Sequence, residues 1–180
     1  SKAMRWAISH FTSTGSWQHF YTSIRMRPIA KLFISIAIPV ITGLIASWFT
    51  VQSVNGWYST LNRPSFAPPN WIFGPVWLVL YVLMGISLYI IWQCPPGIQK
   101  EKALFIFGLQ LFCNFIWSFL FFFMRNPATA LVDIVLLWLL ILVMIVRFYR
   151  LRPLAAWLNI PYLLWVSFAT ALNYMFWKLN

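Results

Sequence analysis

Five long apolar stretches, separated by short segments that contain prolines, glycines and basic residues, dominate the pattern of the chain. They cover about residues 32–51, 71–93, 103–124, 128–149 and 154–177. Each is close to the roughly 20 residues that an α-helix needs to cross the hydrocarbon core of a bilayer. The pattern predicts an all-α, multi-pass integral membrane protein, in which residues 31–180 form one bundle of five transmembrane helices.

The first loop, residues 52–70, differs from the other connections because it is long, aromatic and nearly uncharged. It holds the pair Trp57 and Tyr58, and its only charge is Arg63. The prolines in or just after it are Pro64, Pro68, Pro69 and Pro75. Proline removes a backbone donor and disfavours the interior of a helix, so a lipid-facing helix is not expected here. We expect this loop to fold as a structured lid over the mouth of the bundle.

Composition supports a protein that is surrounded by lipid. Of the 180 residues, 62% are hydrophobic, 8% are charged and only two are acidic. Soluble domains carry about 25% charged residues, so this chain has too little charge to solvate its own surface. The net charge of +11 lies mostly in the loops, where basic residues set the topology and contact lipid headgroups. The bilayer is therefore the expected partner, and nucleic acid is excluded.

Basic residues are distributed unequally between the two ends of the bundle. One side carries ten: Lys2, Arg5, Arg25, Arg27, Lys31, Lys100, Lys102, Arg147, Arg150 and Arg152. The other carries three: Arg63, Arg125 and Lys178. Because cytoplasmic loops are enriched in Lys and Arg, we expect the N-terminus on the cytoplasmic side if the membrane is bacterial. The lid and the C-terminus are then expected together on the opposite face.

Residues 1–30 form a basic N-terminal arm without acidic residues. The arm lacks the apolar core of a secretory signal, which leaves a transit peptide or an interfacial arm, and we favour the interfacial arm. His10 and His19 have no carboxylate or cysteine beside them, so no metal site is expected.

Few polar side chains interrupt the apolar stretches, and each requires a reason because burial in lipid is costly. Gln110, Asn114 and Trp117 have helical spacing and share one face. The two amides either face a ligand or hydrogen-bond another helix. Asp133 is the only carboxylate within a stretch. We expect it to anchor a tryptophan N–H, an amide or the lid rather than to relay protons, since a relay requires several ionisable groups.

Two further helical faces carry aromatic residues. One consists of Trp77, Tyr81, Met84 and Leu88, and the other of Trp165, Ala169, Leu172, Asn173 and Phe176. Tryptophan is unusually frequent, and flat rings that line a pocket suit a flat apolar ligand, with simple packing as the alternative. The chain has no Ser/His/Asp set, no zinc-binding spacing and no phosphate-binding glycine loop. Hydrolysis and phosphoryl transfer are therefore excluded, while redox chemistry or photochemistry by tryptophan stays open.

The first loop and the second stretch carry a specific motif. It consists of Trp57-Tyr58, Leu61, Arg63-Pro64-Ser65-Phe66-Ala67-Pro68-Pro69, Trp71, Phe73-Gly74-Pro75-Val76-Trp77, Leu80-Tyr81 and Met84-Gly85. The motif, together with residues 110–117, 130–133, 153–156 and 161–174, closely resembles the translocator protein family. This family is also called the tryptophan-rich sensory protein or peripheral-type benzodiazepine receptor family (TspO/MBR).

The resemblance implies a five-helix bundle whose first loop covers a pocket that opens on the lid side. It implies a receptor or carrier that binds tetrapyrroles, such as protoporphyrin IX and haem-related molecules, and synthetic benzodiazepine-type ligands. No cofactor is required, because the porphyrin is the ligand. A bacterial membrane and the mitochondrial outer membrane both stay open as locations.

Carried over by position, the resemblance places ten residues in the pocket: Trp57, Tyr58, Pro68, Trp77, Asn114, Trp117, Asp133, Trp165, Ala169 and Leu172. Trp77 and Trp165 match tryptophans linked in bacterial relatives to light- and oxygen-dependent breakdown of protoporphyrin IX. They are therefore candidate catalytic residues for an alternative, enzymatic function. Sterol or lipid handling is a third alternative, because Leu172, Tyr174 and Lys178 fit a loose sterol pattern.

Two features depart from the family. A homodimer is expected from the resemblance, but bulky Phe112 stands four residues after Gly108, where a small residue would complete the helix-packing stripe. The N-terminal arm is also longer than in the usual bacterial form. A plain transporter has the least support, because no internal repeat and no proton-relay residues are visible.

Overall fold

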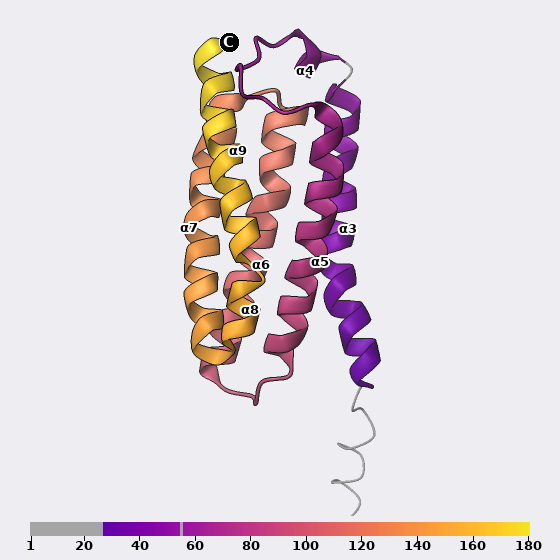
Figure 1. Cartoon of the computed structure of the whole chain (residues 1–180), viewed down its shortest axis with the longest axis vertical. Coiled ribbons are helices and arrows are strands. Elements are labelled where there is room, and N and C mark those ends of the chain that lie inside the picture. The colour runs from indigo at the N-terminus through magenta and orange to yellow at the C-terminus, as the bar shows by residue number, and fades with distance from the viewer. Residues whose placement is uncertain (1–26, 55) are drawn as a thin grey trace, which may run out of the picture. The chain divides into compact units, whose positions relative to one another are not determined.

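The computed structural model describes residues 27–54 and 56–180, and the regular elements of these residues are all helices (Figure 1). In chain order they are α3 (Pro28–Val54), α4 (Trp57–Thr60), the short 3₁₀-helix η1 (Asn70–Ile72), α5 (Phe73–Trp92), α6 (Ile98–Ser118), the π-helix η2 (Phe119–Phe123), α7 (Pro127–Leu151), α8 (Pro153–Trp157) and α9 (Ile160–Leu179). Residues 1–26 of the predicted arm, which include both histidines, lie outside the described residues. The helices pack within the compact unit Leu32–Asn180.

Five helical segments of the described chain are long and apolar enough to cross a membrane, and they confirm the predicted bundle. They are Pro28–Val54, Asn70–Trp92, Ile98–Phe123, Pro127–Leu151 and Pro153–Leu179. Two of them are less regular than the sequence predicts. The third ends in the π-helix η2, and the fifth turns at Leu158 and Asn159 before α9 begins. Pro161, in the first turn of α9, lacks the backbone N–H that would bond back to α8, so a continuous helix is interrupted there.

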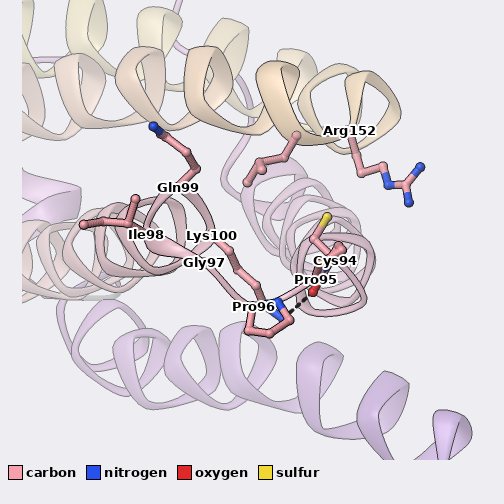
Figure 2. A pocket seen from close by; sticks show the side chains of 9 residues that line it. Cys94, Pro95, Pro96, Gly97, Ile98, Gln99, Lys100 and Arg152 are labelled. Atoms are coloured by element: carbon pink, nitrogen blue, oxygen red, sulfur yellow. Dashed lines mark hydrogen bonds between the residues drawn. The ribbon is translucent and has the colours of Figure 1, made fainter.

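Polar groups close the short connections at the helix ends. Nζ of Lys100 donates hydrogen bonds of 2.7 Å to the carbonyl oxygens of Trp92 and Cys94, which caps the end of α5. Figure 2 shows this loop, beside which lies a cavity of about 300 Å³. At the start of α7, Oδ1 of Asn126 accepts a hydrogen bond of 3.1 Å from the backbone N–H of Thr129.

Two glycines allow α3 and α5 to approach closely. A Cβ atom on Gly43 would overlap the ring of Tyr81, and a Cβ atom on Gly85 would overlap the backbone of Ile36. The remaining surface of α3 exposes large apolar side chains: Ile29, Phe33, Ile34, Ile38, Ile41, Leu44, Ile45, Trp48 and Val51. Such a surface fits a helix that faces lipid.

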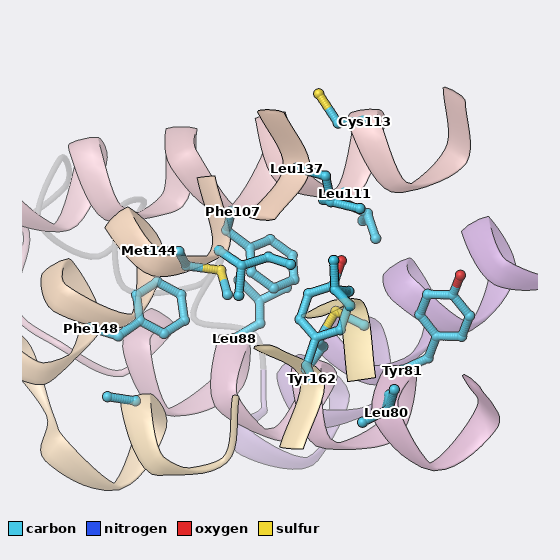
Figure 3. Close-up of a cluster of buried hydrophobic side chains, with 14 of the residues drawn as sticks. Leu80, Tyr81, Leu88, Phe107, Leu111, Cys113, Leu137, Met144, Phe148 and Tyr162 are labelled. Carbon is cyan, nitrogen blue, oxygen red and sulfur yellow. The ribbon is translucent and has the colours of Figure 1, made fainter. Parts of the chain in front are cut away.

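The main hydrophobic core lies between α5, α6, α7 and the α8–α9 segment (Figure 3). Phe107 of α6 and Phe148 of α7 stack within it, with their ring centres 6.3 Å apart. Tyr81, Met84 and Leu88 of α5 are buried in the same core. The inward face that the sequence predicts for the second span is therefore confirmed at these three positions.

The lid and the C-terminus lie at the same end of the bundle, as the alternation of spans predicts (Figure 1). The backbone N–H of Asn62 donates to Oδ1 of Asn180 at 2.8 Å. The side-chain amide of Asn62 donates to the carbonyl of Leu179 at 3.2 Å, and that of Asn180 donates to the carbonyl of Asn62 at 3.3 Å. These three hydrogen bonds tie the lid to the end of α9.

Candidate functional site

A cavity of about 600 Å³ lies beneath the lid. It is lined by residues of α3, the lid, α5, α6 with η2, and α9. Among the described residues, α7 contributes none to this lining. Its aromatic lining consists of Tyr58, Trp71, Phe73, Trp77, Tyr81, Trp117, Phe121, Phe122, Trp165 and Phe176. Every lining residue in the described chain is uncharged. The cavity therefore offers broad ring surfaces and little charge to a guest.

The cavity brings together most of the pocket residues implied by the resemblance. The six that line it are Tyr58, Trp77, Trp117, Trp165, Ala169 and Leu172. The four that do not line it are Trp57, Pro68, Asn114 and Asp133. Ligand binding by any of the ten stays a prediction. The structure divides them into six residues that line the cavity and four that lie outside its lining.

Tyr58 anchors the lid in the bundle. Its side chain is only 4% exposed and packs against Phe121, Phe122 and Phe176. The guanidinium of Arg63 lies 5.8 Å from the centre of the Tyr58 ring. Burial raises the pKa of the Tyr58 phenol above its usual value of 10, and the positive charge of Arg63 partly opposes this rise. The phenol is therefore neutral at physiological pH.

Trp57 and Pro68 support the lid rather than line the cavity. The ring of Trp57 makes an edge contact with Phe121, whose ring centre is 6.0 Å away. The carbonyl oxygen of Pro68 accepts a hydrogen bond of 2.9 Å from the Arg63 guanidinium. This bond folds the proline-rich half of the lid back on itself.

A buried chain of hydrogen bonds lies at the inner end of the cavity. The Tyr81 hydroxyl donates to Oδ1 of Asn114 at 2.7 Å, and the Asn114 amide donates to the Tyr162 hydroxyl at 3.0 Å. The Tyr162 hydroxyl donates in turn to Oε1 of Gln110 at 2.9 Å. Both amides therefore hydrogen-bond other helices, which was one of the two alternatives left open by the sequence. The chain also supports Trp77, whose ring stacks on Tyr81 with centres 5.5 Å apart.

Trp117 is held by a second polar chain. Its indole N–H donates to Oδ1 of Asn173 at 3.0 Å, and the Asn173 amide donates to the carbonyl oxygen of Pro127 at 2.8 Å. The two bonds join α6, α9 and the start of α7. They fix the ring of Trp117 in the cavity wall, with its centre 6.4 Å from that of Trp77.

Trp165 and Asp133 each hold a buried polar atom without a hydrogen-bond partner among the described residues. These atoms are the indole Nε1 of Trp165 and Oδ2 of Asp133. Oδ2 of Asp133 therefore does not make the anchoring contact to a tryptophan N–H, an amide or the lid that the sequence predicts. Trp165, by contrast, stands in the cavity wall, and its N–H is a donor that a ligand carbonyl or carboxylate would satisfy.

The three residues of the sterol pattern do not share one surface. Leu172 is buried and lines the cavity, whereas Tyr174 and Lys178 are exposed. Residues two apart on a helix point in different directions, so Leu172 and Tyr174 face opposite surroundings. The structure thus places Tyr174 and Lys178 on the outside of α9.

Sequence reasoning missed the contribution of α3 to the cavity. Its lining residues are Val40, Gly43, Leu44, Ala46, Ser47, Thr50, Val51 and Val54. None is aromatic or charged, so none stood out from an ordinary lipid-facing span. A run of small residues at helical spacing, Gly43, Ser47 and Thr50, is the signal that would have found this face.

The described residues hold no cluster of three metal-ligating side chains. Within this part of the chain, the cavity lining consists of aromatic rings and aliphatic side chains with a few amides and hydroxyls. Such groups are suited to stacking and hydrogen bonding.

Comparison with known proteins agrees with the fold. The sequence profile of the TspO/MBR family matches residues 35–178. The chain is 44% identical to the tryptophan-rich protein TspO of Archaeoglobus fulgidus over 153 residues, which cover 84% of this chain and 98% of that protein. It is 42% identical to the translocator protein of Homo sapiens over 127 residues, or 69% of this chain and 75% of that protein. It is 36% identical to the tryptophan-rich sensory protein of Cereibacter sphaeroides over 124 residues, or 69% of this chain and 77% of that protein.

Proposed function

Because this chain belongs to the TspO/MBR family, we propose that it is a membrane receptor or carrier whose cavity beneath the lid binds a tetrapyrrole such as protoporphyrin IX. The aromatic cavity is the observation that carries this proposal. Its volume of about 600 Å³ lies within the usual range of roughly 300–1,000 Å³ for small-molecule pockets. Flat rings on several walls suit a flat macrocycle, since aromatic pairs stack with their faces offset.

The polar ends of a tetrapyrrole also find suitable partners. A porphyrin carries carboxylates at one edge, and Arg63 is the only cationic residue of the lid segment 52–70. Its guanidinium already covers Tyr58, which lines the cavity. A guanidinium binds a carboxylate through two parallel hydrogen bonds. The carboxylate edge would therefore lie under the lid, with the macrocycle between the tryptophans.

A titration in the dark tests this function. Purified protein is added to protoporphyrin IX, and the shift of the porphyrin absorption band is followed to saturation. Trp77→Ala removes a wall ring and is expected to raise Kd by about ten-fold, a typical loss for an aromatic anchor. Trp48→Ala is the matched control, because Trp48 is exposed on α3 and does not line the cavity. Equal affinities for these two variants, or a shift that never saturates, would contradict the proposal.

Light-dependent breakdown of the bound porphyrin by dioxygen is a second candidate function. The stacking of Trp77 on Tyr81, together with Trp165 in the same cavity, favours it. In this reaction dioxygen is reduced and the macrocycle is oxidised. An indole donates an electron to the light-excited macrocycle, the macrocycle passes that electron to dioxygen, and the oxidised indole then takes an electron back from the macrocycle, so that the indole is unchanged overall. Illumination of the saturated complex should then form product more slowly in Trp77→Phe and Trp165→Phe. Unchanged product formation in both would leave the protein as a binder only.

A further inference from the structure

The cavity has a second boundary below the lid, between the lid-proximal ends of α3 and α5, where its wall residues are also exposed on the outer surface of the bundle. We propose that the ligand exchanges sideways with the bilayer through a slot between α3 and α5, and not through the lid. The ligand class is thereby narrowed to flat molecules that partition into the bilayer, with a broad apolar face and any charged groups at one edge. This inference rests on the proposed function, because it concerns access to the same cavity.

Two facing helical stripes form the slot. On α3 the stripe is Leu44, Ser47 and Val51, and on η1–α5 it is Trp71, Gly74 and Leu78. Each has the spacing i, i+3, i+7, which places its members on one side of a helix. All six line the cavity, and all six are exposed as well.

The degree of exposure distinguishes these residues from an ordinary wall. Leu44 is 62% exposed, Val51 68%, Trp71 73% and Leu78 53%. A residue that lines a closed cavity in the middle of a bundle is largely buried, as Ala169 and Leu172 are. The cavity therefore reaches the outer surface along these two stripes.

The slot ends where α3 and α5 touch. Below it, Gly43 lies against the ring of Tyr81, and Gly85 lies against the backbone of Ile36. These contacts leave no space for a Cβ atom, so the two helices form a closed seam there. The opening therefore spans about two helical turns, or roughly 10 Å at 1.5 Å per residue.

The chemistry of the rim fits lipid rather than water. Among its six side chains only Ser47 and Trp71 carry a polar group, and the Ser47 hydroxyl already donates to the carbonyl oxygen of Leu44 at 2.7 Å. The single indole N–H of Trp71 belongs to a side chain that is typical of the membrane–water interface. A lipid-facing opening with so few polar groups favours guests that pass with an apolar face toward the rim. The lid, in contrast, is fastened by Tyr58 and by the hydrogen bonds between Asn62 and Asn180.

Gly74 offers the sharpest test, because nothing lies within 4 Å of a Cβ atom built there. A phenylalanine at this position fits the helix and narrows the slot. With the protein in lipid nanodiscs, we expect Gly74→Phe to slow both association and dissociation of protoporphyrin IX by on the order of ten-fold, with a much smaller change in Kd, as for a gated site. Gly108→Phe is the matched control, since Gly108 also has open space around it but lies on α6, away from the cavity.

A second variant tests the lid. Asn62→Ala removes the side-chain donor to Leu179 and weakens the fastening. If the ligand passes through the slot, the exchange rates of Asn62→Ala equal those of the unmodified protein. Faster exchange in Asn62→Ala, or unchanged exchange in Gly74→Phe, would overturn the inference while saturable binding persists. Failure of the proposed function itself would look different, because the unmodified protein would then show no saturable binding.

Discussion

The hydroxyl of Tyr81 donates a hydrogen bond of 2.7 Å to Oδ1 of Asn114, deep in the bundle. Both side chains are buried, and the same Tyr81 ring fills the space beside Gly43 of α3 and supports Trp77. This single pair therefore connects helix packing to the geometry of the cavity wall. Its loss is expected to affect both stability and binding.

Asn114→Leu leaves the Tyr81 hydroxyl without an acceptor and the Tyr162 hydroxyl without a donor. We expect the free energy of unfolding in detergent to fall by about 1–3 kcal/mol, the cost of unsatisfied buried polar groups. The double variant Tyr81→Phe/Asn114→Leu should cost less than the sum of the two single changes, because they share one bond. Strict additivity in the unfolding measurement would show that this bond contributes nothing.

Gly85 and Gly108 form a natural pair for testing the contact between α3 and α5. Gly85→Ala forces a methyl group against the backbone of Ile36, which cannot rotate away as a side chain can. We expect destabilisation of about 1–3 kcal/mol, typical of overpacking. Gly108→Ala meets nothing within 4 Å, so it should be neutral or stabilise α6 by up to about 1 kcal/mol. Thermal unfolding of the two variants gives the comparison, and equal midpoints would show that the α3–α5 contact is loose.

The fold was predictable because its main signals are local. The length of an apolar stretch decides whether it spans a bilayer, and helical spacing decides which side chains share a face. The faces that hold Tyr81 and Asn173 were recognised in this way, and both residues are buried in the structure. The turn at Asn159 was missed, since Pro161 near a helix start and Pro161 inside a long span look alike in the sequence.

The site was harder to predict because it depends on how the helices are rotated against one another. Asp133 is conspicuous as the only carboxylate in a span, yet α7 does not reach the cavity. Ser47 and Thr50 are inconspicuous, yet α3 presents both to the cavity. Chemical character marks a residue as unusual, but only tertiary packing determines which surface it joins.

The distribution of basic residues predicts the orientation of the bundle in a bacterial membrane, and this prediction is open to a direct measurement. Ser65→Cys lies in the lid and Gln99→Cys in the first turn of α6, at the opposite end of the bundle, and both positions are exposed. In a background without the buried Cys94 and Cys113, a membrane-impermeant maleimide added to spheroplasts should label only Ser65→Cys, because the lysine- and arginine-rich end is expected to face the cytoplasm. After permeabilisation, both should be labelled. The reverse pattern would place the N-terminus outside.

Arg63 is expected to distinguish a charged porphyrin from an uncharged one. In the unmodified protein, protoporphyrin IX should bind more tightly than its dimethyl ester, which has the same macrocycle without carboxylate charges. Arg63→Gln should remove this preference and weaken binding of the diacid by about ten-fold, since one charge-assisted hydrogen bond contributes roughly 1.5–3 kcal/mol. Binding of the ester should stay nearly constant, which controls for damage to the lid through the lost bond to Pro68. Equal loss for both ligands would mean that Arg63 acts on the lid alone.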